Sequence, residues 1–188
     1  MGRYVKLALA GEGGQGVQSV ANIITDAAYM EGYEALYIPN FGVEQRGGVS
    51  IAFVQISDGP IGSPKFKIAD IVIALSDRAV RRTKMYCGPK TLFVYDANIK
   101  DIENDLPDNG ARILAIPAIK VAKEELHPRV FNIVIMGAVI GVTEIVTVEQ
   151  ARKAIEAKLG YKFEQDPKLR ELNFKALDRG IELVKGLI

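Results

Sequence analysis

Two glycine-bearing segments in the first quarter of the chain have residue types that can bind an anion. The first, Gly11–Gly16, has the spacing G-x-G-x-x-G and contains Gly11, Gly13, Gly14, Gln15 and Gly16. Glycine adopts positive φ without steric cost, so backbone N–H groups can approach a negatively charged ligand at the start of a helix. This spacing is typical of dinucleotide-binding turns, although alone it is a weak signal.

The surrounding residues do not complete a dinucleotide site. Such a site needs an acidic residue near the end of the second strand to hold a ribose hydroxyl. Here that strand ends in Tyr37–Asn40, Glu31 and Glu34 precede it, and Glu12 would repel a pyrophosphate. The pattern therefore favours a tight strand-to-helix turn that needs glycine for steric reasons, with contact to a phosphate or a partner chain as the alternative.

The second segment, Pro39–Gly48, places Glu44, Arg46 and Gly47 in a glycine-rich loop. An arginine beside glycines is accessible and can bind a carboxylate or phosphate through two parallel hydrogen bonds. A local Glu44–Arg46 ion pair on a solvated loop is the simpler interpretation. Both segments follow strands, however, and open α/β sheets usually bind ligands at the carboxyl ends of their strands.

The remaining composition predicts neither a catalytic residue nor a metal site in this chain. One cysteine, Cys87, and one histidine, His127, cannot build an iron–sulfur cluster or a His-rich metal site. We expect His127 at the surface. A net charge of +1, from 24 basic and 23 acidic residues, does not suggest nucleic-acid or membrane-surface binding. The absence of a long apolar run and of paired cysteines predicts a cytoplasmic protein.

Hydrophobic periodicity predicts alternating strands and helices. The first strand, helix and second strand form a unit that usually gives a parallel pair. Thr147 with Gln150 forms a capping box, and Asp166–Pro167 predicts another helix start. We expect an α/β protein: a three-layer α/β/α sandwich with a mostly parallel sheet, as a single domain over residues 1–188. The predicted strands are 4–10, 35–38, 49–57, 71–75, 91–95 and 112–116, and the predicted helices are 17–28, 77–85, 119–126, 131–142, 148–159 and 167–185.

Several motifs in order resemble the gamma subunit of 2-oxoacid:ferredoxin oxidoreductases. The family has Gly-x-Gly-Gly-Gln-Gly-Val near its start and then Pro-x-(Phe/Tyr)-Gly-x-Glu-x-Arg-Gly-Gly. The likeness covers nearly the whole chain, and the ordered set is far more specific than any one motif. The matching segments here are Gly11–Val17, Pro39–Gly48, Ile56–Ile61, Ala69–Ser76, Phe131–Ala138 and Leu172–Gly180.

The resemblance implies a subunit that is not catalytic by itself. In such an enzyme a 2-oxoacid is decarboxylated on thiamine diphosphate with Mg²⁺, an acyl-CoA is formed, and electrons pass through [4Fe–4S] clusters to ferredoxin. These cofactors belong to alpha, beta and ferredoxin-like delta subunits, and no cofactor is expected in this chain. The resemblance makes the two glycine segments candidates for an interface or for the approach of CoA.

Some positions depart from the family pattern. Glu44–Gly48 is closer to the 2-oxoglutarate, branched-chain or arylpyruvate types than to the pyruvate type, whose loop more often contains Arg-Arg-Gly-Ala-Pro. Val43, Gln45 and Ala69 replace residues that are commoner in the family. A second hypothesis is a free-standing nucleotide- or CoA-binding module that uses the Gly11–Gly16 turn.

Overall fold

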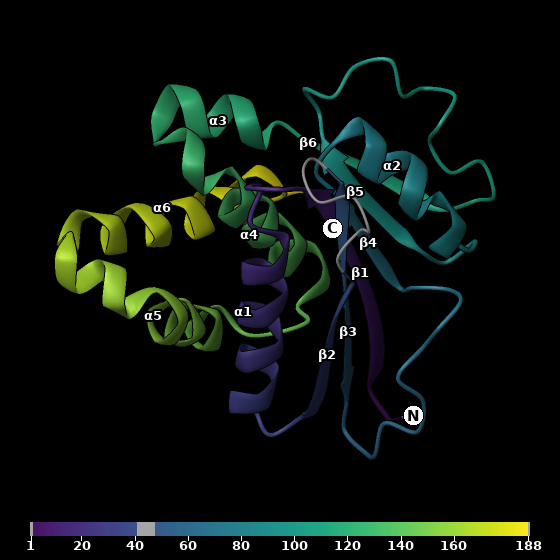
Figure 1. The fold of residues 1–188 in the computed structure, drawn as a ribbon, viewed down its shortest axis with the longest axis horizontal. Coiled ribbons are helices and arrows are strands. Elements are labelled where there is room, and N and C mark those ends of the chain that lie inside the picture. The colour runs from purple at the N-terminus through teal and green to yellow at the C-terminus, as the bar shows by residue number, and fades with distance from the viewer. Residues whose placement is uncertain (1, 41–47, 188) are drawn as a thin grey trace.

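The sheet has β3 inserted between the first two strands of the chain. The computed structural model describes residues 2–40 and 48–187. Within these residues, six strands form one sheet in the order β2-β3-β1-β4-β5-β6 (Figure 1). The strands are β1 (Tyr4–Glu12), β2 (Glu34–Asn40), β3 (Val49–Ser57), β4 (Ile71–Ala74), β5 (Leu92–Asp96) and β6 (Arg112–Ile116).

Of these described strands, only β3 runs against the others. It pairs antiparallel with both β1 and β2, whereas β1, β4, β5 and β6 pair in parallel. The predicted parallel pairing of the first two strands is therefore wrong, because β3 separates them. The link 41–48 is shorter than the dozen or more residues of a crossover connection, so it can only join antiparallel neighbours.

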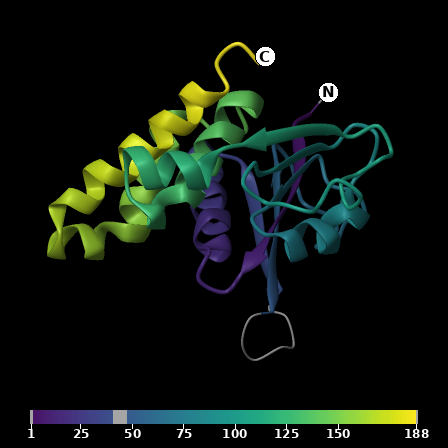
Figure 2. The same ribbon diagram turned by 90° about the horizontal axis from the view of Figure 1, so that it is seen from above.

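Helices lie on both faces of the sheet, but unevenly. Helix α1 packs on β2 and β3, α4 contacts β5, and α5 and α6 pack outside α1 and α4 (Figures 1 and 2). Helix α2 covers β1 and β4 on the opposite face. The prediction of an α/β protein with a mostly parallel sheet is confirmed. The helices are α1 (Val17–Met30), α2 (Asp77–Thr83), α3 (Ala118–Glu125), α4 (Phe131–Thr143), α5 (Val148–Gln165) and α6 (Pro167–Leu183), with short 3₁₀ turns η1 (Lys84–Tyr86) and η2 (Pro128–Val130).

The predicted helix starts are confirmed by their capping contacts. The Thr147 side chain accepts a hydrogen bond from the Gln150 N–H at 3.3 Å, and Asp166 accepts one from the Lys168 N–H at 3.1 Å. The second half of the predicted capping box differs, because the Thr147 N–H donates to the Glu31 carboxylate and not to the Gln150 side chain. Strand β2 continues through Pro39, where the sequence predicted a stop. A proline fits there because β2 is an edge strand.

Helices α4 and α6 approach closely because each has a glycine at the crossing. A Cβ atom on Gly137 would lie 2.2 Å from the Leu177 carbonyl oxygen, and one on Gly180 would lie 2.0 Å from the Val134 carbonyl oxygen. No side chain fits between the two backbones. This contact seats the buried centre of α4 (Ile133–Ile140) under the C-terminal helix.

We therefore expect Gly180→Ala to destabilise the chain by about 2–3 kcal/mol or more, because the added methyl group meets rigid backbone. Gly160 in α5 is the matched control, since a Cβ atom there meets nothing within 4 Å. Gly160→Ala should raise the free energy of unfolding by about 0.5–1 kcal/mol through helix propensity. Urea unfolding of both variants measures this, and equal effects would contradict the close crossing.

A buried carboxylate, Asp96, holds the start of α3 against the end of β5. It is 0% exposed and accepts hydrogen bonds from the Asn98 N–H at 2.8 Å and the Ile119 N–H at 2.7 Å. Helix α3 has no capping side chain at its own N-cap, Pro117, so Asp96 performs this role from a distance. Burial raises the pKa of Asp96 above its ordinary value of 3.8, although these backbone N–H donors oppose the shift.

The raised pKa predicts the direction in which the free energy of unfolding changes with pH. A carboxyl with a higher pKa in the folded state binds protons more tightly there, so its contribution to stability is largest below pH 3.8 and is lost as the pH rises through the folded value. The unfolding free energy of the wild type minus that of Asp96→Asn should therefore increase as the pH falls from about 7 to about 4. Urea melts across this range measure the difference, and a constant or decreasing difference would refute the prediction.

Candidate functional site

The four glycines of the Gly11–Gly16 turn differ in whether, and why, the backbone requires glycine at that position. Gly14 and Gly16 have φ of 89° and 77°, which favour glycine. A Cβ atom on Gly11 would lie 2.7 Å from Oε1 of Gln15 and 2.8 Å from Val17. Gly13 is exposed and would meet nothing within 4 Å. Three of the four glycines are therefore required by the turn itself, as the steric interpretation predicted.

Gln15 fastens the turn to the centre of the sheet. Its side-chain oxygen accepts a hydrogen bond from the Glu12 N–H at 2.7 Å, and its amide donates to the Leu75 carbonyl oxygen at 2.9 Å. Leu75 directly follows β4. Gln15 therefore acts as a positioning residue between the end of β1 and the end of β4.

Helix α1 begins at the turn without a side-chain cap, and α4 begins beside it. The N-cap of α1 is Gly16, and no side chain accepts a hydrogen bond there. A Cβ atom on Gly16 would lie only 2.2 Å from Nδ2 of Asn132, which stands in the first turn of α4. The glycine thus allows the Asn132 amide to lie against the start of α1.

A cavity of about 870 Å³ opens at this junction. It lies between the start of α1, η2, the start of α4, and the end of α5 with the start of α6. Its apolar lining includes Ile23, Val130, Phe163 and Leu172. Polar lining comes from Gly14, Gly16, Ser19, His127, Arg129, Asn132, Lys162, Asp166, Lys168 and Asn173.

The charge of this cavity is predominantly positive. The side chains of Arg129, Lys162 and Lys168 line it, and the His127 imidazole lies beside them and accepts a hydrogen bond from the Arg129 N–H at 3.2 Å. The one carboxylate in the lining, Asp166, is occupied in capping α6. The arrangement suits a ligand with negative charge at one part and apolar character at another.

Glu12 does not oppose this charge. Strand alternation directs it to the opposite face of the sheet, towards α2. There its carboxylate lies 3.9 Å from the Arg78 guanidinium. The repulsion predicted between Glu12 and a bound phosphate therefore does not apply to this cavity.

The structure places the predicted site residues in three groups. Gly14 and Gly16 line the cavity, Gly11 and Gln15 shape the turn, and Gly13 is exposed beside it. Glu44, Arg46 and Gly47 lie outside the described residues, so their role stays a prediction. Val49 pairs with Glu12, so the start of β3 lies at the same end of the strands as the glycine turn.

Sequence reasoning missed the basic side chains of the cavity. His127 is exposed, as expected, but it also lines the cavity, and Arg129, Lys162 and Lys168 were not singled out. Their segments meet the glycine turn only through the packing of α4, α5 and α6. The Asp166–Pro167 helix start was the one local signal near them.

The lone cysteine is buried and cannot serve redox chemistry at the surface. Cys87 is 4% exposed, and its thiol lies 3.8 Å from the Thr83 carbonyl oxygen. Burial raises its pKa to about 11, so the reactive thiolate is scarce at neutral pH. Within residues 2–40 and 48–187, no group of three or more His, Cys, Asp or Glu side chains could hold a metal ion. Every helix in that part of the chain is too short or too polar to cross a bilayer.

The family model of pyruvate ferredoxin/flavodoxin oxidoreductase matches residues 6–183. The chain belongs to this family. It is a gamma subunit of a 2-oxoacid:ferredoxin oxidoreductase complex, as the resemblance predicted. The 2-oxoglutarate synthase subunit KorC of Methanocaldococcus jannaschii is 33% identical over 97% of this chain and 95% of its own.

Two solved structures show the same fold. The gamma subunit of a keto/oxoacid ferredoxin oxidoreductase from Geobacter sulfurreducens has a TM-score of 0.82 and 28% identity, with 97% of both chains covered. The 2-oxoglutarate:ferredoxin oxidoreductase of Magnetococcus marinus has a TM-score of 0.88 and 26% identity. This gamma subunit aligns over 99% of its length but spans only 32% of that longer chain.

We expect Gly16→Ala to destabilise the gamma subunit by about 1–2 kcal/mol, because alanine is strained at positive φ. The added methyl group would also displace the Asn132 amide. Gly13→Ala, three residues earlier, should change stability by less than about 0.5 kcal/mol. Urea unfolding of the two variants compares them, and a Gly13→Ala cost equal to that of Gly16→Ala would show that the turn imposes no such distinction.

Proposed function

We propose that this gamma subunit binds the phosphate-bearing part of CoA in the cavity beside the glycine turn. In this proposal the complex decarboxylates a 2-oxoacid, forms an acyl-CoA and passes electrons to ferredoxin. The observation that carries the proposal is the convergence of His127, Arg129, Lys162 and Lys168 on one cavity whose lining is otherwise partly apolar.

The chemistry of CoA matches the two parts of the cavity. Its phosphates are anionic and would be held by the basic side chains and by free N–H groups at the start of α1. Its pantetheine arm is largely uncharged and would lie on Ile23, Phe163 and Leu172. The structure of the Magnetococcus marinus relative has 2-oxoglutarate, coenzyme A and succinyl-CoA bound, which supports CoA as the ligand class.

The donor set of this chain does not fit the redox cofactors of such an enzyme. A [4Fe–4S] cluster needs about four thiolates, whereas Cys87 is alone and buried. We therefore assign thiamine diphosphate, Mg²⁺ and the clusters to alpha, beta and delta subunits. Thiamine diphosphate supplies the decarboxylation chemistry, while residues of this chain bind and orient. The whole chain, residues 1–188, would act as one gamma-type domain in a cytoplasmic complex.

A free-standing dinucleotide-binding module is the alternative function. The strand order weighs against it, because β3 separates β1 from β2. In a dinucleotide fold the second strand lies beside the first and carries the ribose-binding carboxylate. Here the end of β2 is Asn40, two strands away from the glycine turn.

The CoA proposal predicts a specific kinetic defect. In the assembled enzyme, Lys168→Ala should raise the KM for CoA by about threefold to tenfold and leave the KM for the 2-oxoacid unchanged, because one charge-assisted contact is lost. Lys175→Ala is the matched control, since Lys175 is on the same helix but pairs with Glu171 outside the cavity. Methyl-viologen reduction with co-expressed alpha and beta subunits gives both constants. An unchanged KM for CoA, or an equal effect of Lys175→Ala, would reject the cavity as the CoA site.

Arg46 is tested in the same assay. If it binds CoA or the substrate carboxylate, Arg46→Ala raises one KM by more than about tenfold, or ~1.4 kcal/mol.

Isothermal titration of the isolated chain with NAD, FAD, FMN, ATP and CoA distinguishes the free-standing module from the subunit proposal. Micromolar binding of a dinucleotide would favour the free-standing module over the subunit proposal.

A further inference from the structure

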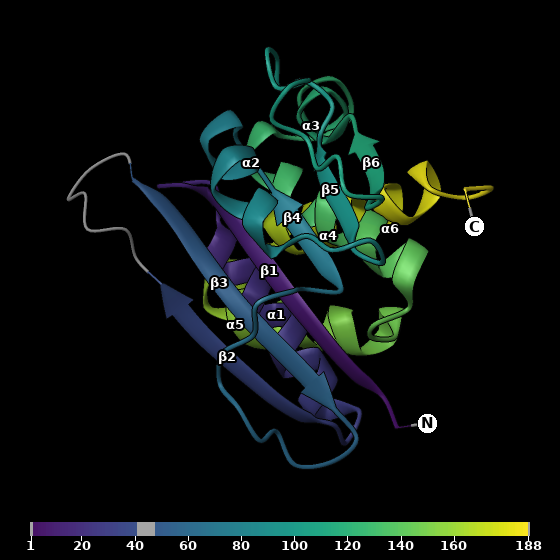
Figure 3. The ribbon, with the colours of Figure 1, turned by 90° about the vertical axis from the view of Figure 1, so that its right-hand side faces the viewer.

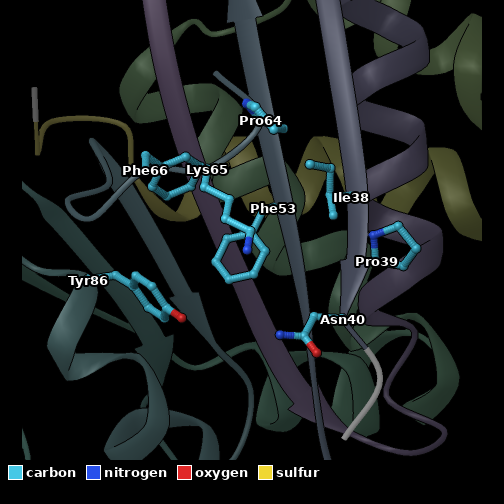
Figure 4. A pocket seen from close by; sticks show the side chains of 8 residues that line it. All are labelled: Ile38, Pro39, Asn40, Phe53, Pro64, Lys65, Phe66 and Tyr86. Atoms are coloured by element: carbon cyan, nitrogen blue, oxygen red, sulfur yellow. The ribbon is translucent and has the colours of Figure 1, made fainter.

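An aromatic cleft lies on the sheet face opposite α1, away from the CoA cavity. Its volume is about 500 Å³, and it is formed over β2 and β3 (Figure 4). Figure 3 shows this side of the sheet, where α2 lies over β1 and β4, while the loop that follows β3 crosses in front of β2 and β3. The cleft is lined by Ile38, Pro39, Asn40, Phe53, Pro64, Lys65, Phe66 and Tyr86.

Three aromatic rings from separate segments meet in this cleft. Phe53 of β3 lies edge-to-face with Phe66, at 5.5 Å between ring centroids, and with Tyr86 of η1, at 5.3 Å. Ile38 of β2 is the register partner of Phe53 and forms the opposite wall. All three rings are only partly buried. The chain thus leaves a concave aromatic surface open to solvent, and such surfaces commonly bind partners.

The segments that supply the rings also expose other apolar side chains. Ile68, two residues after Phe66, is 49% exposed, and Met85, next to Tyr86, is 73% exposed. A hydrogen bond of 2.8 Å from the Ala69 N–H to the Tyr86 carbonyl oxygen joins the two segments. The two segments that form the cleft therefore also expose apolar side chains that could bury against a partner.

The charge at the cleft is positive. Lys65 lines it and Lys67 is exposed beside it. None of the eight lining residues is acidic. Neither lysine forms an ion pair with the part of the chain that the structure describes. An occupant that carries carboxylates near an apolar side chain would complement this surface.

The family supplies the kind of occupant. This chain is one subunit of a multi-subunit complex, and in Magnetococcus marinus the matching region is only 32% of a longer chain. Some of its surface must therefore face other parts of the enzyme. The opposite face of the sheet is already covered by α1, α4, α5 and α6, whereas on this face β2 and β3 are crossed by the loop that carries Pro64 and Phe66 and only the margin of β3 meets α2.

We propose that the aromatic cleft is the docking site for another subunit of the complex, which inserts an apolar side chain flanked by carboxylates. The inserted side chain packs on Phe53, Phe66 and Tyr86, and the carboxylates pair with Lys65 and Lys67. This inference rests on membership of the family and not on the CoA proposal, so a failed CoA test leaves it standing.

Two variants of the assembled complex test this surface. Lys65→Glu reverses a charge on an exposed side chain and should not affect folding, while Phe66→Ala removes one wall of the cleft. Each should raise the dissociation constant of the gamma subunit at least about tenfold, as loss of a central contact does. Mass photometry of the complex over a dilution series measures this. Lys120→Glu on α3 is the matched charge reversal, since Lys120 is exposed and away from the cleft, and it should change the dissociation constant by less than about twofold.

Carbodiimide cross-linking of the wild-type complex gives an independent measurement. Lys65 or Lys67 should cross-link to an Asp or Glu of another subunit, identified by mass spectrometry. Unchanged dissociation constants for both variants, or no such cross-link, would overturn the proposal. A dimer of the isolated chain that Lys65→Glu dissociates would also overturn it, since the cleft would then seat a second copy.

Discussion

The short link between β2 and β3 is the constraint on which the rest of this architecture depends. Residues 41–48 cannot return the chain across the sheet, so β3 turns back antiparallel beside β2. Strand β1 then pairs with the far side of β3, and its own helix α1 spans from β1 to β2 across the intervening strand. The turn at the end of β1 therefore has the glycine spacing of a dinucleotide turn, but the second strand of the chain, β2, does not lie beside β1 as it does in a dinucleotide fold.

The elements of this fold were largely predictable from local patterns, whereas their order in the sheet was not. Val49–Ser57 and Arg112–Ile116 match their predicted bounds because turn residues flank each apolar run. The position of β3 depends on pairing between distant segments, and its alternating apolar residues fit either a parallel or an antiparallel neighbour. Helix α5 continues to Gln165, beyond the predicted end at Leu159, because Gly160 alone does not break a helix that has packing support.

In the candidate site, too, some features follow from the local sequence, whereas others depend on the packing of distant segments. The conformational need for Gly14 and Gly16 is local, since both take positive φ in a strand-to-helix turn. The contact of Gly16 with Asn132 joins residues far apart in the sequence and forms only when α4 packs beside α1. The same packing brings Arg129, Lys162 and Lys168 around one cavity. No spacing rule along the chain connects these side chains, so sequence alone identified the turn but not the charge in front of it.

The near-zero net charge concealed this uneven distribution. Many acidic residues are paired with basic ones on the outer helices: Arg170 with Glu156, Arg179 with Glu125, and Lys153 with Glu149. These cations lower the pKa of their glutamates, but the pairs are exposed and stabilise the fold little. Each such pair is neutral, so the basic surplus at the cavity and at the aromatic cleft is balanced by carboxylates elsewhere on the surface, such as the exposed Asp101 and Glu103. A net charge of +1 thus argues against a uniformly basic surface, yet it permits two separate anion-attracting regions on opposite faces of one sheet.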